Sequence, residues 1–367
     1  MTKKRIAIVH NLPKGGAIRM LTDIANRYKY SCVIDIYSIS ENKPLKIRGT
    51  SLNWIKVKPW KGFFPFNLWI ICILPIIHRL VSKKYNWKHY DFVFFSHDHY
   101  TKSPYLIRYI KGVKKYYLCQ ESQREFYEPI KYHTEGTKDK ITTFLRFPIK
   151  LIDRKNTSYV TKLFCNSKYS KATLEKIYKK ECEIVYPGVN EKFFYPSKQK
   201  KENLILCVGG INKTKNQEFL VNVLTPILDK YKLILVGQGR KSFINKIKKI
   251  NPNVEIYSNI TDTDLRELYR KAMVTCISAY KEPFGLSSIE SQSCGTPVVA
   301  VRGGGTEETI LNGINGYVVN LSQNEYLEKV KKTLTHSHSM GKKARDNVTN
   351  KWTNNITLKT LDKYFLK

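Results

Sequence analysis

The stretch from residue 280 to residue 316 decides the fold, and it reads YKEPFGLSSIESQSCGTPVVAVRGGGTEETILNGING. A strand is expected just before it at 274–278, followed by a helix at 287–294. The glycine-bearing turn between them leaves the first N–H groups of the helix available to an anionic phosphate. A second strand, 297–301, then leads to a glycine-rich turn at 303–305. This order of elements predicts a nucleotide crevice at the carboxyl ends of parallel strands.

Two carboxylates, Glu282 and Glu290, stand on either side of the first turn. Glu282 precedes the expected phosphate site, whereas Glu290 lies two turns into the helix. From these positions one carboxylate can reach a sugar hydroxyl and the other can reach a ribose diol. Two solvated glutamates on an ordinary helix are the alternative, but the ordered set of motifs around them favours nucleotide binding.

Alternating strands and helices extend from this stretch along the chain, which is typical of parallel α/β sheets. A chain of 367 residues is longer than one ordinary hydrophobic core requires. A polar, lysine-rich linker at 192–203 separates two such series, so we expect two doubly wound, Rossmann-like domains facing a cleft. The expected strands are 5–10, 33–37, 52–57, 92–96, 115–119, 163–166 and 183–186 in the first domain, and 204–208, 232–236, 254–257, 274–278 and 297–301 in the second.

The net charge of +34 is extreme, since 64 Lys and Arg stand against 30 Asp and Glu. Residues 1–190 carry +22 of it. Such a charge predicts an anionic partner, which could be nucleic acid, an anionic lipid surface or a phosphorylated substrate. A generally lysine-rich composition would explain many of the lysines equally well. The eight scattered cysteines have no metal-binding spacing, which indicates buried thiols in a reducing compartment.

Two segments combine aromatic and basic residues in a way that suits a membrane interface. They are 60–71, which holds Trp60 and Trp69, and 144–152. A core helix of the first domain is the alternative. The apolar run 63–77 is interrupted by prolines and is expected to be shorter than a bilayer span needs. No apolar signal-peptide region follows the charged N-terminus.

The stretch 280–316 resembles the family 4 retaining glycosyltransferases, which have the GT-B fold. The shared pattern is Glu, seven residues, Glu, with Phe284 and Gly285 shortly after the first glutamate. A Gly-Thr-Pro-Val-Val strand follows the second glutamate, and a Gly-Gly-x-x-Glu turn ends at Glu308. An ordered set of this length is specific, whereas two glutamates at this spacing alone would mean little.

The resemblance covers nearly the whole chain and implies its division. Residues 1–190 would form an acceptor-binding domain and residues 191–350 a nucleotide-sugar-binding domain. Residues 351–367 would form a terminal helix that crosses back to the first domain.

The resemblance implies a donor site in the second domain. Lys215 there would stabilise charge on the departing diphosphate, Glu282 would hold hydroxyls of the donor sugar, and Glu290 would hold the ribose. The family usually has an arginine where this chain has Gly210, and Lys213 on the same loop is the expected substitute. The other donor-site residues implied are Gly209, Pro283, Phe284, Gly285, Leu286, Ile260 and Leu265.

The resemblance also assigns features of the first domain. Gly15 and Gly16 match a turn whose backbone approaches the phosphates and the sugar. Gln120 stands where the family often has a histidine. A glutamine can hydrogen-bond a sugar hydroxyl but cannot carry a proton at neutral pH, so the departing phosphate is expected to accept the acceptor's proton. Arg124 is expected to be an additional cation facing the same region.

His97, Asp98 and His99 follow the strand 92–96 and should lie at the carboxyl edge of the first sheet. Consecutive side chains point in alternating directions and rarely ligate one ion, so we expect no metal site. His97 and His99 are expected to hydrogen-bond the acceptor, with a purely structural role as the alternative.

Together these features predict a retaining hexosyltransferase of glycan biosynthesis. It would move a sugar from a GDP- or UDP-sugar to a hydroxyl of a glycan or lipid-linked acceptor, with no metal and no other cofactor. The expected location is cytoplasmic, with the inner face of an anionic membrane as the candidate peripheral surface. One alternative is a glycoside phosphorylase on the same fold. Another is a basic, non-enzymatic binder of nucleic acid or membrane, but no nucleic-acid motif is present and nucleic acid is not an expected partner.

Overall fold

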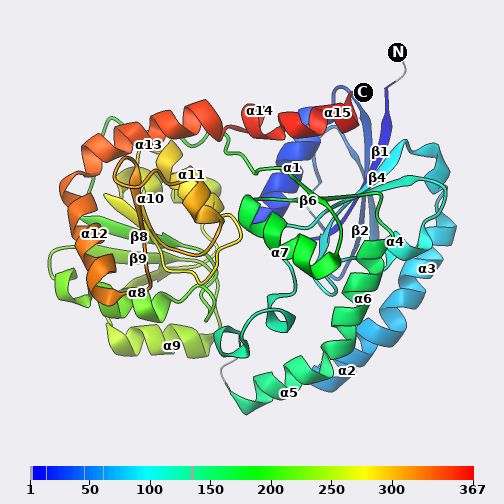
Figure 1. Cartoon of the computed structure of the whole chain (residues 1–367), viewed down its shortest axis with the longest axis horizontal. Helices are drawn as coiled ribbons and strands as arrows, with labels where there is room; N and C mark the ends of the chain where they lie inside the picture. The colour runs from blue at the N-terminus through cyan, green and yellow to red at the C-terminus, as the bar shows by residue number, and fades with distance from the viewer. Residues whose placement is uncertain (1–2, 14, 45, 61, 134–135) are drawn as a thin grey trace. The chain divides into compact units, whose positions relative to one another are not determined.

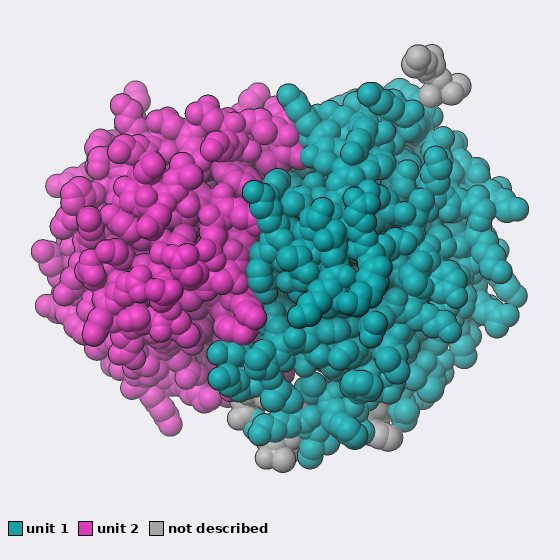
Figure 2. Space-filling model, viewed as in Figure 1, with its two compact units in different colours: residues 1–186, 358–367 teal, residues 187–357 magenta. Residues whose placement is uncertain are grey.

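The computed structural model describes residues 3–13, 15–44, 46–60, 62–133 and 136–367. The chain forms two compact units, coloured separately in Figure 2. Unit 1 is Met1–Tyr186 with Leu358–Lys367, and unit 2 is Pro187–Thr357. The domain limits expected from the sequence stay a prediction, because compactness alone does not test independent folding.

Unit 1 is built on a seven-stranded parallel sheet in the order β3-β2-β1-β4-β5-β6-β7. Its strands are β1 Arg5–Asn11, β2 Val33–Ser40, β3 Ser51–Lys56, β4 Phe92–Asp98, β5 Lys114–Leu118, β6 Lys162–Cys165 and β7 Cys182–Ile184. Alternate residues of β1 belong to two different core clusters, with Ile6 and Ile8 on one face and Ala7 and Val9 on the other. Both faces of the sheet are therefore covered, which explains why its strands read as nearly continuous apolar runs.

The helices of unit 1 include the last residues of the chain (Figure 1). They are α1 Gly16–Tyr28, α2 Phe63–Leu68, α3 Leu74–Lys84, α4 Leu106–Tyr109, α5 Thr137–Leu145, α6 Phe147–Ser158, α7 Lys168–Tyr178 and α15 Asp362–Phe365. Helix α15 packs on α1, since the rings of Tyr28 and Phe365 stack with centroids 4.2 Å apart. Arg27 and Asp362 form an ion pair of 2.8 Å beside them.

Unit 2 is built on a six-stranded parallel sheet in the order β10-β9-β8-β11-β12-β13. Its strands are β8 Leu204–Val208, β9 Lys232–Val236, β10 Glu255–Tyr257, β11 Val274–Ile277, β12 Val298–Val301 and β13 Gly316–Val319. Its helices are α8 Gln217–Leu224, α9 Lys241–Ile250, α10 Asp262–Lys271, α11 Leu286–Ser293, α12 Gln323–Thr335, α13 Ser337–Lys351 and α14 Asn354–Thr357. This is the strand order of dinucleotide-binding sheets, and it reverses between β8 and β11.

The expected α/β class with two doubly wound parallel sheets is confirmed. Every predicted strand is present, with ends shifted by three residues at most. The sequence analysis missed β13, which has only four residues and begins with a glycine. Gly316 is needed there because a Cβ on it would lie 2.0 Å from the carbonyl oxygen of Val298 on β12.

The apolar run 63–77 was expected to be too short to span a bilayer, and this expectation is wrong. The helix over Phe66–Lys84 has 19 residues, and among the described residues it is long and apolar enough to cross a membrane. Pro75 does not end it, because the preceding stretch Trp69–Ile73 is π-helical and adjusts the hydrogen bonds around the missing N–H. Length and composition are weak evidence for a span, since a core helix passes the same test and 33% of this one is buried.

The two tryptophans of the expected membrane segment 60–71 have different surroundings. Trp69 is buried in the core of unit 1, at 2% exposure, so the core alternative is the correct one for it. Trp60 is 48% exposed, and Lys61 lies outside the described residues. Further exposed apolar side chains lie on α3 and on α5–α6, namely Ile76, Leu80, Ile141, Phe144, Phe147 and Leu151.

Substituting the two tryptophans separately should give opposite results. Trp69→Ala removes a ring that packs edge-on against Tyr100, and it should lower the free energy of unfolding by about 3–5 kcal/mol. Trp60→Ala, the matched control, should change it by less than about 0.5 kcal/mol. Urea unfolding followed by far-UV circular dichroism measures both. Equal losses in the two variants would contradict the placement of Trp69 in the core.

Candidate functional site

Two loops meet where the strand order of unit 2 reverses. The loop 209–216 follows β8, and the loop 278–285 follows the neighbouring strand β11. They are hydrogen-bonded to each other, since the N–H of Tyr280 donates to the carbonyl of Thr214 at 2.8 Å. The hydroxyl of Ser278 donates to the carbonyl of Lys215, also at 2.8 Å. Motifs that are about 70 residues apart in the sequence thus form one edge of the sheet, the usual place for a ligand in this topology.

Lys215 and Glu282 form an ion pair across these loops, between Nζ and Oε2. Their side chains are 29% and 14% exposed, so the pair is partly shielded but accessible. The sequence analysis gave these residues separate roles and did not predict that they touch. A lysine ammonium has three donors, so the contact with Glu282 leaves Lys215 able to bind an anion as well.

The second glycine-rich turn packs directly on the Glu282 loop. The N–H of Gly305 donates to the carbonyl of Glu282 at 2.7 Å. A Cβ on Gly304 would lie 2.3 Å from that same carbonyl oxygen, and one on Gly305 would lie 2.3 Å from the carbonyl oxygen of Pro283. Both positions therefore require glycine for close backbone approach.

Helix α11 begins at this point, and its N-cap residue is Gly285, which has no side chain that could accept from the first N–H groups. Gly285 precedes it with φ of 84°, in the left-handed region where glycine is favoured. The first N–H groups of a helix have no acceptor within the helix, and they carry the positive end of the helix dipole. Because α11 starts four residues after Glu282, the helix terminus and the ammonium of Lys215 provide positive charge at one place.

Glu290 and the expected base-binding residues lie deeper in unit 2. Glu290 is buried at 3% exposure, and one of its oxygens accepts a hydrogen bond of 3.1 Å from the hydroxyl of Tyr269. Ile260 precedes α10 and is half-buried, whereas Leu265 on α10 is 7% exposed. The roles of these three residues in binding ribose and base stay predictions.

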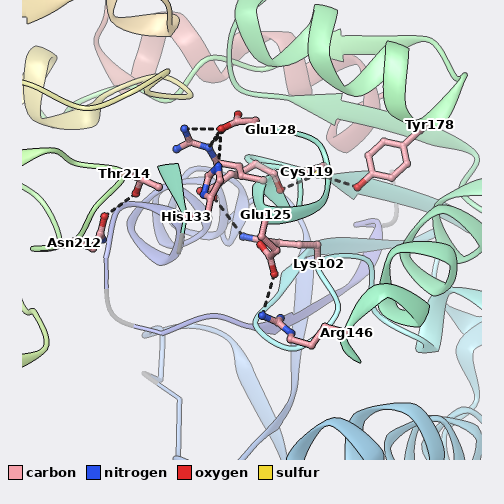
Figure 3. Close-up of polar contacts among 11 residues, drawn as sticks. Lys102, Cys119, Glu125, Glu128, His133, Arg146, Tyr178, Asn212 and Thr214 are labelled. Atoms are coloured by element: carbon pink, nitrogen blue, oxygen red, sulfur yellow. Dashed lines mark hydrogen bonds and ion pairs between the residues drawn. The ribbon is translucent and has the colours of Figure 1, made fainter. Parts of the chain in front are cut away.

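The loop after β8 is shaped by Asn212, which the sequence analysis did not single out. Its amide oxygen accepts from the N–H of Lys215 at 3.1 Å and from the hydroxyl of Thr214 at 2.6 Å (Figure 3). An asparagine three residues before the functional lysine is the signal that was available, since this side chain often closes turns. Lys213 is exposed on the same loop, and its substitution for the missing arginine at Gly210 stays a prediction.

The predicted features of unit 1 gather at the carboxyl edge of its sheet. The side chain of Gln120, just after β5, donates from Nε2 to the carbonyl of Ala17 at 3.2 Å. Gln120 therefore lies against the first turn of α1, next to Gly15 and Gly16. The catalytic role of Gln120 and the donor-binding role of Gly15 and Gly16 stay predictions.

The three residues that follow Ser96, namely His97, Asp98 and His99, have distinct surroundings. His97 is kept neutral by burial, which lowers its pKa to about 3, and its Nδ1 is buried without a hydrogen-bond partner among the described residues. Burial raises the pKa of Asp98 to about 6, and its carboxylate accepts from the N–H groups of Tyr100 and Thr101 at 2.7 and 3.0 Å. His99 is exposed. Within the described ranges, no three His, Cys, Asp or Glu side chains lie close enough to hold a metal ion.

Arg124, which was expected to be an additional cation facing this region, is paired with an acidic side chain. Its guanidinium pairs with Glu128 at 3.0 Å, and Nε2 of His133 lies 3.0 Å from the same carboxylate (Figure 3). All three side chains are 8% exposed. Burial raises the pKa of Glu128, but the bonds from His133 and Arg124 outweigh it and hold that pKa below its usual value. The i,i+4 spacing of Arg124 and Glu128 was a signal for this pair.

A fully buried carboxyl, Asp153, lies behind this edge on α6. It accepts from the N–H of Ser103 at 3.0 Å and from the hydroxyl of Tyr178 at 2.8 Å. That hydroxyl also lies 4.0 Å from the sulfur of Cys119 (Figure 3). Burial raises the pKa of Asp153 to about 7, although the hydrogen bonds from Tyr178 and Ser103 act in the opposite direction.

Comparison with known proteins identifies the second half of the chain. Residues 189–351 match the family Glycosyl transferases group 1. An uncharacterized glycosyltransferase of Methanocaldococcus jannaschii is 28% identical over 176 residues, which are 47% of this chain and 50% of that protein. The chain thus spans about half the length of this curated relative, and 30% of a D-inositol 3-phosphate glycosyltransferase from Xylanimonas cellulosilytica that is 30% identical.

Solved structures are similar over the whole chain. Sucrose-phosphate synthase from Thermosynechococcus elongatus has a TM-score of 0.77 at 18% identity, covering 99% of this chain and 98% of that one. HepE of Anabaena, solved with UDP and glucose, has a TM-score of 0.72 at 15% identity and covers 99% of both chains. The chain therefore has the GT-B fold. Residues 189–351, which match the family Glycosyl transferases group 1, carry the Lys215–Glu282 site.

The buried carboxyl of Asp153 should make stability fall as pH rises. Its pKa is about 7 in the folded chain and about 3.8 when unfolded, so between these values the folded state holds the extra proton. The free energy of unfolding should then decrease with pH across pH 4–7 by up to about 1.4 kcal/mol per unit, and this contribution should be flat above pH 7. Asp153→Asn should lose that slope, as measured by urea unfolding at pH 5, 6, 7 and 8. Identical slopes in both proteins would show that Asp153 is ionised throughout.

Proposed function

We propose that the protein is a retaining hexosyltransferase that moves a sugar from a UDP- or GDP-sugar to an acceptor hydroxyl. One observation carries the proposal: Lys215, Glu282 and the amino end of α11 meet at the strand-order reversal of a group 1 glycosyltransferase domain. The structures of HepE with UDP and with UDP-glucose support a nucleotide sugar as the donor. The family 4 assignment and retention at the anomeric carbon rest on the sequence pattern.

The diphosphate of the donor would bind at the amino end of α11. As the bond to the sugar breaks, negative charge grows on the leaving diphosphate, and the chain stabilises it with fixed positive charge. The amino end of α11 and the Lys215 ammonium provide that charge at the same loops. The acceptor's proton would pass to the departing phosphate.

Glu282 would serve the sugar and position the lysine. Its ion pair with Lys215 fixes the ammonium, while its second oxygen can accept hydrogen bonds from hydroxyls of the donor sugar. Carboxylate charge close to the anomeric carbon would also stabilise the oxocarbenium-like transition state. Glu290 would hold the ribose, and its bond from Tyr269 fixes the orientation of its carboxylate.

The acceptor side of the proposal rests on unit 1. Gln120, His97 and His99 are the expected hydrogen-bonding groups, and a glycan or a lipid-linked glycan is the expected acceptor. A cytoplasmic, peripheral location at an anionic membrane is supported by the +22 charge of residues 1–190. The exposed apolar side chains Phe144, Phe147 and Leu151 on α5–α6 support it as well.

The two lysines of the β8 loop should differ in their effect on transfer. Lys215→Ala should lower kcat/KM at least about tenfold and weaken nucleoside diphosphate binding, because it removes a charged contact to the diphosphate. Lys213→Ala is the matched control, with a change of about threefold or less. Radiolabelled sugar transfer and calorimetric titration with UDP and GDP measure the two effects. A loss confined to Lys213→Ala would reverse the assignment.

Variants of Glu282 and Glu290 distinguish the roles of these two carboxylates from the role of Lys215. Glu282→Gln should slow transfer at least about tenfold while nucleoside diphosphate affinity changes little. Glu290→Gln should weaken nucleotide binding. Release of nucleoside diphosphate from a nucleotide sugar distinguishes a transferase from a phosphorylase, which would use free phosphate.

Transfer should survive excess chelator, because α11 and Lys215 provide the positive charge that a divalent cation supplies in other transferases. The measurement is the initial rate with EDTA, with and without added magnesium or manganese. Complete loss with EDTA and recovery with either ion would contradict metal-independent transfer.

A further inference from the structure

A cavity of about 520 Å³ lies at the amino edge of the unit 1 sheet. It opens to solvent and is lined by the end of α3, the segment before β4 and the segment before β5. All strands of this sheet run parallel, so this edge is opposite the one that carries His97 and Gln120. The seven residues of β4 separate the two edges by roughly 20 Å. The cavity is therefore distinct from the predicted acceptor side, and it has the size of a small-molecule site.

The charge around this cavity is entirely positive. Five cationic residues line it, and no carboxylate does: Arg79, Lys83, Lys88, Arg108 and Lys111. Within the described part of the chain, none of the five forms an ion pair. The Nε of Arg108 is moreover buried with no acceptor among the described residues. Five like charges around one cavity repel one another, and a multiply charged anion would offset that repulsion.

The walls of the cavity are held in place before any ligand binds. Trp87 is buried at 4% exposure, and its indole N–H donates to the carbonyl of Ser82 at 3.1 Å. Asn86 accepts from the N–H of Lys88 at 3.3 Å. The stem of Lys88 crosses Gly112, where a Cβ would lie 3.1 Å from the lysine Cε. Such preorganisation lowers the entropy cost of binding.

Three aromatic residues, Tyr85, Trp87 and Tyr109, also line the cavity. They offer apolar and ring surface beside the cations, which suits a phosphate attached to a carbon skeleton better than inorganic phosphate alone. Outside the cavity, Ile76 and Leu80 are exposed on α3 beside Arg79 and Lys83. An acyl chain could lie along that stripe while a headgroup occupied the cavity.

We propose that this cavity is a second anion site, which binds a small phosphorylated ligand with two or more negative charges. The ligand is either a soluble phosphate ester or the headgroup of an anionic lipid, since both present the same chemistry to the five cations. The site is separate from the donor site of unit 2, and it does not depend on the proposed function.

Calorimetric titration of the full chain with inorganic pyrophosphate tests the site. Lys88→Ala with Lys111→Ala should weaken pyrophosphate binding at this site at least about tenfold at low salt, and added salt should reduce the difference. The control variant, Lys155→Ala with Lys176→Ala, removes the same charge from exposed positions of α6 and α7 and should bind like wild type. Lys215→Ala should leave this binding step intact, which separates it from the donor site.

Sedimentation with vesicles distinguishes the two sources of phosphate. Vesicles that contain phosphatidic acid, a phosphomonoester lipid that can carry two negative charges, should sediment wild type more than the Lys88/Lys111 variant if the ligand is a lipid headgroup, with phosphatidylcholine vesicles as the control. Pyrophosphate binding without this difference would identify a soluble ligand. Melting curves check folding, and Arg79→Gln with Lys83→Gln on α3 is a second variant for the same measurements. Equal affinities in the variants, the control and wild type, or no binding of either probe, would overturn the proposal.

Discussion

Reversal of the strand order is the constraint on which both units depend. In such a sheet the connections leave the two strands at the reversal, here β8 and β11, toward opposite faces, and a crevice forms between the loops after them. In unit 2 the sheet edge there is closed by backbone instead of side chains. Gly304 and Gly305 lie against Glu282–Phe284 at distances that admit no Cβ, which holds the Lys215–Glu282 pair and the start of α11 in one small volume.

Acidic and basic side chains have different surroundings in this chain, whose net charge is +34. Where carboxylates are buried they are satisfied, as with Glu128 between Arg124 and His133, or protonated over much of the pH range, as with Asp153. The unbalanced lysines and arginines lie at surfaces and in the amino-edge cavity of unit 1. A small number of carboxylates thus lies in the interior. The excess of positive charge remains available for anionic ligands.

Much of the fold could be predicted because the strands are apolar runs buried on both faces, as β4 and β8 illustrate. The site motif could be predicted because glycines and glutamates occur there in a specific order. What could not be predicted depends on distant contacts: the pairing of Lys215 with Glu282, the neutralisation of Arg124, and the burial of Trp69 where Trp60 is exposed. Continuation of a helix through Pro75 also needed the π-helical turn before it, which no local propensity indicates.

The terminal segment has a consequence for how the chain is made. Phe365 is fully buried in the same cluster as Ile6 and Tyr28, so the core of unit 1 includes residues from both ends of the sequence. The ribosome synthesises residues 1–186 well before residues 358–367. Domains generally fold in the order of their synthesis. During that interval the nascent first unit exposes an apolar surface that its own last residues will later cover. Unit 2, whose residues 187–357 are continuous, can be completed first.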